Sequence, residues 1–178
     1  STFQSFSGGW VGASGGTLLL YSSIIANNKA HYGGGGISAW GDYSSNIEHT
    51  QVIINGSTIT GNQAGDDGAG LSIYNSNCVL VRTEISRNTA LRGYGGGLRL
   101  QKDGSGTMTV DIRETTFTAN KAYKGNEIYT INTPTISIVN TLFNQPIDSN
   151  NNFYDYNGAT WNTCANNVCT ATPFTLSL

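Results

Sequence analysis

The sequence is poor in charge, proline, cysteine and methionine, and it contains no long apolar run. Of its 178 residues only 11% are charged and the formal net charge is −2, so neither a nucleic-acid surface nor an anionic-membrane surface is indicated. No run approaches the roughly 18 apolar residues of a membrane span, which argues against membrane insertion. With three prolines and 38% apolar residues, disorder is also disfavoured.

Small and turn-forming residues take the place of the missing types. The chain has 23 Gly, 21 Thr, 20 Asn and 17 Ser, and little Leu, Lys or Glu. Such a composition disfavours helices and favours short strands joined by many turns. We therefore expect an all-β protein.

Two short sequence words recur along the chain. The first runs Ser or Thr, any residue, Ile, Phe or Leu, two residues, then Asn, and it occurs as SSIIANNKA (22–30), GSTITGNQA (56–64), RTEISRNTA (82–90), RETTFTANKA (113–122) and, with Gln145 in place of Asn, VNTLFNQPI (139–147). The second occurs as GGTLLL (15–20), GGISAW (35–40), AGLSIY (69–74), GGLRLQ (96–101) and NEIYTI (126–131). Constant strands with variable loops are typical of a solenoid, in which each coil contacts only its neighbours.

The strand words also alternate with period two. We expect Ile37, Leu71, Leu98 and Ile128, with the residues two positions later, to face inward, and Ser38, Ser72, Arg99 and Tyr129 to face outward. The sequence thus predicts a single-stranded right-handed parallel β-helix of about five to six coils with terminal caps. A β-sandwich is the alternative, but it needs no repeated word. Residues 1–14 are interpreted as an N-terminal strand or cap, 15–147 as the repeats, and 148–178 as an aromatic cap with a hairpin and a terminal strand.

The recurring asparagines are expected at a fixed corner of each coil. Asn tolerates left-handed backbone, and its amide can bond a stacked neighbour. The predicted corner residues are Asn28, Asn62, Asn88 and Asn120.

The two words resemble the repeats of chlamydial-type polymorphic outer membrane proteins, and more broadly right-handed parallel β-helix repeat proteins. The resemblance is carried by GGIS (35–38), AGLS (69–72) and GGLR (96–99), and by IANN (25–28), ITGN (59–62), ISRN (85–88) and FTAN (117–120). It implies cell-surface passengers, adhesins or structural repeats. The sequence departs from the pattern at Asn126-Glu127, which replaces Gly-Gly, and at Gln145.

Cysteines and one sequon bear on the compartment. Cys164 and Cys169 are expected to close a disulfide hairpin, with zinc as the alternative, and Cys78 to be a buried small residue. A disulfide indicates an oxidising, extracellular or cell-surface location. Asn55-Gly56-Ser57 is a full N-glycosylation sequon, so Asn55 is a candidate glycan site. The chain starts at Ser1 as a processed product or as a segment of a longer protein.

Few residues point to chemistry. Asp66-Asp67 is the one adjacent carboxylate pair, and it is a candidate for acid/base catalysis or calcium binding, although a solvated turn is the ordinary interpretation. Tyr32, Tyr94 and Tyr123 occupy related loop positions, where they are expected either to pack the loop or to form a platform for a glycan or partner. The glycines before Leu98 lead into an alternating strand rather than a helix, which argues against a phosphate loop.

We therefore expect no cofactor, no catalytic residue, and a non-catalytic extracellular module with a structural or adhesive role. Its expected partners are copies of itself, forming a fibre or homopolymer end to end, or other surface proteins and glycans. The alternatives are a carbohydrate-active enzyme of the polysaccharide lyase or hydrolase kind and a glycan-binding module.

Overall fold

The computed structural model describes residues 2–3, 11–14, 16–41, 50–104, 107–132, 135–143, 153–156, 160–165 and 168–170. Side chains are described in these ranges from residue 16 to residue 143, and for Tyr154 and Tyr156. Every regular element in this part of the chain is a β-strand, as the composition predicted. Within it, no helix has the length and apolar character needed to cross a membrane.

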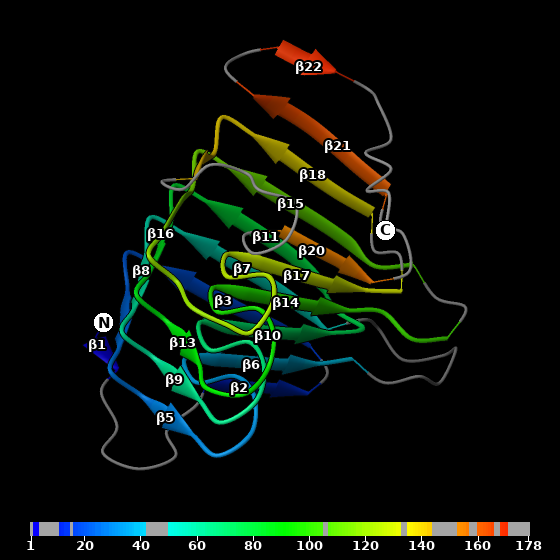
Figure 1. Ribbon diagram of the computed structural model, residues 1–178. Coiled ribbons are helices and arrows are strands. Elements are labelled where there is room, and N and C mark those ends of the chain that lie inside the picture. The colour runs from blue at the N-terminus through cyan, green and yellow to red at the C-terminus, as the bar shows by residue number, and fades with distance from the viewer. Residues whose placement is uncertain are drawn as a thin grey trace.

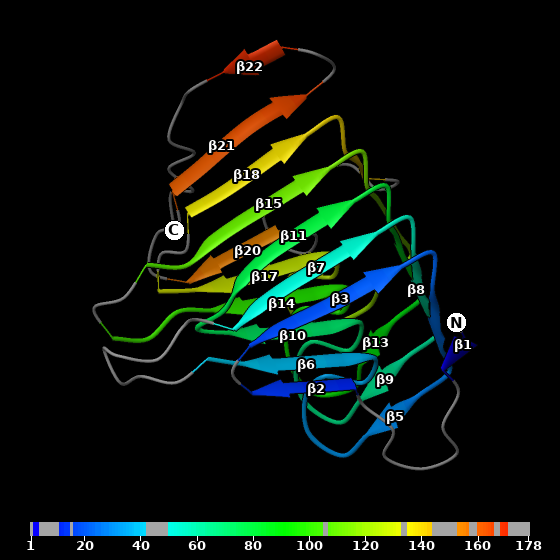
Figure 2. The same cartoon turned by 180° about the vertical axis from the view of Figure 1, so that it is seen from behind.

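The strands form four parallel sheets, which are named A to D below (Figures 1 and 2). Sheet A contains β1 (Thr2–Phe3), β4 (Ile24–Ala26), β8 (Thr58–Thr60), β12 (Glu84–Ser86), β16 (Thr116–Thr118) and β19 (Leu142–Phe143). Sheet B contains β2 (Val11–Ser14), β6 (Ile37–Trp40), β10 (Leu71–Tyr74), β14 (Leu98–Gln101), β17 (Ile128–Ile131) and β20 (Phe153–Tyr156). Sheet C contains β3 (Thr17–Tyr21), β7 (Gln51–Asn55), β11 (Asn77–Val81), β15 (Thr109–Arg113), β18 (Thr135–Val139), β21 (Thr160–Ala165) and the antiparallel β22 (Val168–Thr170). The short sheet D contains β5 (Lys29–Ala30), β9 (Gln63–Ala64) and β13 (Thr89–Ala90).

The chain visits sheets B, C and A in the same order in every turn, so each strand pairs with its counterpart one turn away. Figure 2 shows β3, β7, β11, β15, β18 and β21 stacked as one ladder. Four turns separate β3 from β18, which confirms the predicted parallel β-solenoid, with slightly fewer turns than the five to six predicted coils. Strands β20 and β21 continue sheets B and C beyond residue 147.

The core is built from rows of apolar side chains that stack along the solenoid. The predicted inward row of Ile37, Leu71, Leu98 and Ile128 is in register and fully buried. The residues two positions later form a second fully buried row: Ala39, Ile73, Leu100 and Thr130. Free Cys78 occupies a buried place in sheet C between Val52 and Val110. Because the strands are in register, each apolar side chain packs on the side chains at the same position in the neighbouring turns. Burial of these rows is the main contribution to the stability of the fold.

The Ser or Thr of the first word marks the corner between sheets C and A. The residue before it has left-handed backbone in every turn: Ser22, Gly56, Arg82, Glu114 and Asn140 have φ between 45° and 60°. The hydroxyl then donates to the carbonyl two residues earlier, in Ser23, Ser57, Thr83, Thr115 and Thr141, at 2.8–3.1 Å. Because a small hydroxyl side chain closes this tight turn, the word requires Ser or Thr there.

The four corner asparagines form a continuous buried ladder between sheets A and D. The Oδ1 atom of Asn62 accepts from both the backbone N–H and the Nδ2 of Asn28, at 3.0 Å each. Asn62 makes the same two bonds to Asn88, and Asn88 makes them to Asn120, at 2.9–3.0 Å. The left-handed residue is not the asparagine itself but the one before it, at Asn27, Gly61, Arg87 and Ala119. The ladder asparagine is thus required for its side-chain bonds rather than for its backbone.

Glu127 ends this ladder. Phe117 pairs with Phe143, and their rings stack at 5.2 Å, so the fifth repeat lies one residue later than the alignment on Gln145 predicted. The counterpart of Asn120 is therefore Pro146, which lies outside the described residues. Among the described residues, the Nδ2 of Asn120 donates a hydrogen bond to the carboxylate of Glu127.

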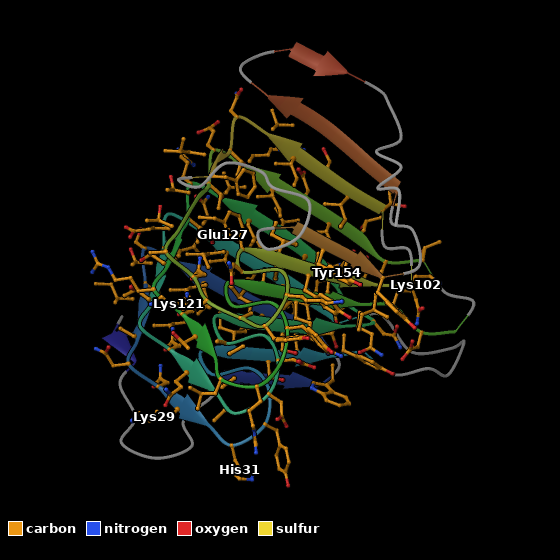
Figure 3. The ribbon with its side chains drawn as sticks, viewed as in Figure 1. Lys29, His31, Lys102, Lys121, Glu127 and Tyr154 are labelled. Atoms are coloured by element: carbon orange, nitrogen blue, oxygen red, sulfur yellow. The ribbon has the colours of Figure 1, made fainter. Side chains whose placement is uncertain are left out.

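The Glu127 carboxyl is fully buried, within the outline of the ribbon in Figure 3, and its Oε1 has no hydrogen-bond partner among the described residues. Burial raises its pKa above the ordinary value near 4.5, against the lowering effect of the Asn120 bond. The folded protein therefore favours the protonated form. The contribution of this carboxyl to the stability of the fold is therefore fully present below its ordinary pKa. It is lost as the pH rises through the raised pKa of the folded protein.

The predicted disulfide falls at the edge of the described structure. Cys164 on β21 lies directly opposite Cys169 on β22 in the antiparallel pair. Both side chains lie outside the described part, so the bond stays a prediction. Among the described side chains there is no disulfide, and Cys78 is a buried free thiol whose pKa is raised to about 12 by burial.

Candidate functional site

The glycine-rich loops before sheet B fold over the outer face of that sheet. In each loop one glycine has left-handed backbone, at Gly34, Gly68, Gly95 and Gly125, with φ of 60–69°. A Cβ added to Gly95 would lie 2.9 Å from the Cβ of Arg99, and one added to Gly34 would lie 2.6 Å from the Cβ of Ser38. The glycines are needed because the loop approaches the strand this closely. The outward residues Ser38, Ser72 and Tyr129 are therefore buried despite facing away from the core.

The side chain of the residue before each left-handed glycine lies over the outer face of the sheet B strand in the next turn. Asp67 reaches Arg99 and forms an ion pair at 3.2 Å. Tyr94 stacks on Tyr129 with ring centroids 4.6 Å apart. Lys124 lies over the ring of Tyr154, 4.2 Å from its centroid, and donates to its hydroxyl at 3.0 Å.

In the first loop this covering position is Gly33, which has no side chain to place over Ser72. A Cβ there would lie 2.9 Å from the Asp67 carbonyl oxygen and 3.6 Å from the Ser72 hydroxyl. A groove of about 580 Å³ lies at this position, and its lining includes Gly33, Trp40 and the largely buried Ser38 and Ser72. We call it the sheet B groove. Its size is in the range of sites for small ligands.

One wall of the sheet B groove is aromatic. Trp40, at the end of β6, is 56% exposed, and its Nε1 donates to the Ser38 hydroxyl at 3.0 Å. Its ring packs on Tyr74 with centroids 4.9 Å apart. On the loop side Tyr32, which is 71% exposed, packs edge-on against His31. Figure 3 shows that His31 projects from the end of the solenoid formed by the first turns.

Asp103 holds the aromatic wall from behind. Its Oδ2 accepts from the Tyr74 hydroxyl at 2.6 Å and from the Nε2 of Gln101 at 2.7 Å. Its Oδ1 accepts from Asn132 at 2.6 Å, and its backbone N–H donates to Asn75 at 2.7 Å. Because Tyr74 is fixed at its hydroxyl, the ring on which Trp40 packs is pre-oriented.

The two carboxylates at the groove each face an arginine. Asp66 pairs with Arg92 at 3.3 Å in a largely exposed contact. Asp67 accepts from the backbone N–H of Tyr94 at 2.7 Å in addition to its ion pair with Arg99. The two carboxylates thus serve different partners. Within the described part of the chain no group of three or more His, Cys, Asp or Glu side chains gathers as a metal site would require.

The three predicted loop tyrosines do not occupy one position. Tyr32 and Tyr123 lie two residues before their left-handed glycines, whereas Tyr94 lies one residue before its glycine. Tyr94 therefore turns onto sheet B, where burial raises the pKa of its partner Tyr129 to about 12. Tyr123 contacts Tyr94 at 6.1 Å and is 68% exposed, but only Tyr32 lines the sheet B groove. The sequence placed Ser72 and Arg99 on the outer face but did not identify them or Trp40 as groove residues, although the tryptophan that ends GGISAW was a visible signal.

The candidate glycan site Asn55 lies away from this groove. It is the last residue of β7, on the outer face of sheet C at the corner to sheet A.

No protein-family model matches the chain, and no curated protein or solved structure matches it. The likeness to polymorphic outer membrane protein repeats thus depends on the quoted residues alone. What the structure establishes is the coarser statement that the chain is a parallel β-solenoid of repeated coils.

Proposed function

We propose that this protein is a non-catalytic extracellular or cell-surface module that adheres to carbohydrate through the sheet B groove. The observation that carries the proposal is Trp40, a half-exposed indole held in one orientation by Ser38 and Tyr74. Large exposed aromatic rings mark interaction sites, and a pyranose presents an apolar face that packs on such a ring. Arg92, Asp66 and the exposed edge of His31 offer hydrogen bonds for sugar hydroxyls nearby.

The non-catalytic part of the proposal is supported by the carboxylates. Paired carboxyl groups act as acid and base when both face the same bond. Here Asp67 is engaged by Arg99 and a backbone N–H, and Asp66 points to Arg92. The two carboxylates therefore face different partners rather than one shared position.

Binding is tested by screening the purified protein against polysaccharides and oligosaccharides and measuring affinity by calorimetry. Trp40→Ala should weaken binding at least tenfold, and Tyr32→Ala should weaken it measurably. Tyr123→Ala is the matched control, because it removes an equally exposed tyrosine outside the groove. Equal affinity of the Trp40→Ala variant, or an equal loss in the Tyr123→Ala variant, would contradict the proposal.

The enzyme alternative is separated by product analysis of the same polysaccharides. New reducing ends or unsaturated products that disappear in Asp66→Asn or Asp67→Asn variants would establish a carbohydrate-active enzyme instead. Binding without any product supports the adhesive module.

End-to-end association is a second proposal, favoured by strand β3. Among the described strands β3 is the edge of sheet C, and its outward Leu19 and Tyr21 are each more than half exposed. An apolar edge strand without charge is suited to pairing with another chain. Filaments in electron micrographs that Leu19→Lys abolishes would support assembly, and a monomer at high concentration by light scattering would contradict it.

A further inference from the structure

We infer that Asn55 is an N-glycosylation site whose first sugar packs on the ring of Tyr21. The sequon Asn55-Gly56-Ser57 spans the end of β7 and the left-handed turn to sheet A, where Gly56 has φ 60°. A sequon alone is common, but here the amide nitrogen of Asn55 and the neighbouring ring of Tyr21 both fit a glycan. The inference is independent of the sheet B groove, because this corner belongs to sheets C and A.

The amide nitrogen of Asn55 makes no contact with the described residues that attachment of a sugar would have to break. Its Oδ1 accepts a hydrogen bond from Nη2 of Arg82 at 3.4 Å, and its Nδ2 has no hydrogen-bond partner among the described residues. Glycosylation changes only the nitrogen, and the carbonyl remains an acceptor. The contact with Arg82 is therefore compatible with a bound glycan.

Tyr21 provides the surface on which the sugar packs. In the parallel pair of β3 and β7, Tyr21 lies directly beside Asn55, and Val81 lies on the other side. All three residues are on the outer face of sheet C, and Tyr21 is 56% exposed. A pyranose on Asn55 would cover this ring with its apolar face, which accounts for a large aromatic side chain left open to water.

The buried corner hydroxyl restricts when the sequon can be recognised. The Ser57 side chain is buried, donates to the Asn55 carbonyl at 3.1 Å and accepts from the backbone N–H of Ser23 at 3.1 Å. An enzyme that reads this hydroxyl must act before the corner closes. The oligosaccharide is donated by a lipid pyrophosphate: the bond from Nδ2 to sugar C1 forms, the bond from C1 to the phosphate oxygen breaks, and Nδ2 releases a proton.

Occupancy is tested by secreting the chain from a eukaryotic host and measuring its mass before and after enzymatic deglycosylation. Wild type and Ser57→Thr should carry the glycan, because threonine occupies the same corner position at Thr83 and Thr115. Asn55→Gln and Ser57→Ala should carry none at this position. Wild-type protein that is secreted and folded but unmodified at Asn55 would overturn the inference.

Packing on Tyr21 is tested with the same chains made in glycosylating and non-glycosylating hosts. The glycan should raise the midpoint of thermal unfolding of wild type and of Tyr21→Phe by about 2–4 °C. Tyr21→Ala should lose this gain, and Tyr123→Ala, at an exposed site elsewhere, should keep it. An equal gain in Tyr21→Ala would overturn the role of the ring while leaving the attachment site intact.

Discussion

Replacement of Asn88 by alanine perturbs the centre of the asparagine ladder. The Oδ1 of Asn88 accepts from the backbone N–H and the Nδ2 of Asn62, both at 3.0 Å. Its Nδ2 donates to the carbonyl of Ile59 and to the Oδ1 of Asn120, both at 3.0 Å. The residue is fully buried, so water has no access to replace these bonds. Alanine leaves two N–H hydrogens of Asn62 without an acceptor: the backbone one, and one of the two on Nδ2, whose other hydrogen is donated to the Ile25 carbonyl.

The expected loss of stability follows from these two unpaired N–H hydrogens. A buried polar group without a partner costs about 1–3 kcal/mol, so we expect the free energy of unfolding to fall by about 2–6 kcal/mol. Native stabilities are about 5–15 kcal/mol, and the loss is therefore a large part of the total. It is measured by urea unfolding followed by circular dichroism and tryptophan fluorescence, with an unchanged m-value as the check that the transition remains comparable.

Asn55→Ala is the matched control in unglycosylated protein. It removes the same side chain from an outer face, where the described contact is one bond of 3.4 Å to Arg82, and it should change stability by less than about 0.5 kcal/mol. If Asn88→Ala lost less than about 1 kcal/mol, the ladder bonds would not be net stabilising. The recurrence of Asn would then need another explanation.

Three further outcomes are expected. Glu127→Gln should raise the free energy of unfolding at pH 7 and should have little effect below pH ~4, because the protonated carboxyl is the form that burial favours. Gly41→Ala should cost about 3 kcal/mol or more, since its Cβ would lie 1.9 Å from the Asn75 carbonyl oxygen. Gly16→Ala meets no atom within 4 Å and has only the strain of its left-handed φ of 82°, so it should cost less in the same urea assay. Cys78 should resist thiol reagents until the protein unfolds. In the unfolded protein, one reactive thiol without reductant and three with reductant would support the predicted hairpin disulfide. Three reactive thiols under both conditions would contradict it.

The fold was predictable because the solenoid repeats one local rule in every turn. Inward residues such as Leu71 and Leu98 stack in register, so a period of two in each word is enough to locate the core. The ladder asparagines were predictable for the same reason. Their mechanism was not, since the left-handed angle belongs to the preceding residue and the requirement for Asn arises only when two turns meet.

The sheet B groove could not be predicted from the sequence of any one repeat. Gly33, Asp67, Tyr94 and Lys124 look unrelated in the sequence, and they become equivalent only when the left-handed glycines are aligned. For the same reason the loop tyrosines divide into two positions, Tyr94 being offset by one residue from Tyr32 and Tyr123, although Tyr94 and Tyr123 are in contact. A loop whose length varies hides such an offset, whereas paired strands reveal it.

The covering position also explains why a binding surface forms on this sheet. The inner rows, the hydroxyl corner and the asparagine ladder each use similar residues in successive turns, because their side chains stack on or bond to one another. The residue before the left-handed glycine is free to differ, because its side chain reaches over the outer face of the next turn. Asp67, Tyr94 and Lys124 close that face, and Gly33 opens it beside Trp40. A larger residue at position 33 should therefore fill the groove and reduce carbohydrate affinity. The substitution should also lower the free energy of unfolding, because a Cβ at position 33 would lie 2.9 Å from the Asp67 carbonyl oxygen.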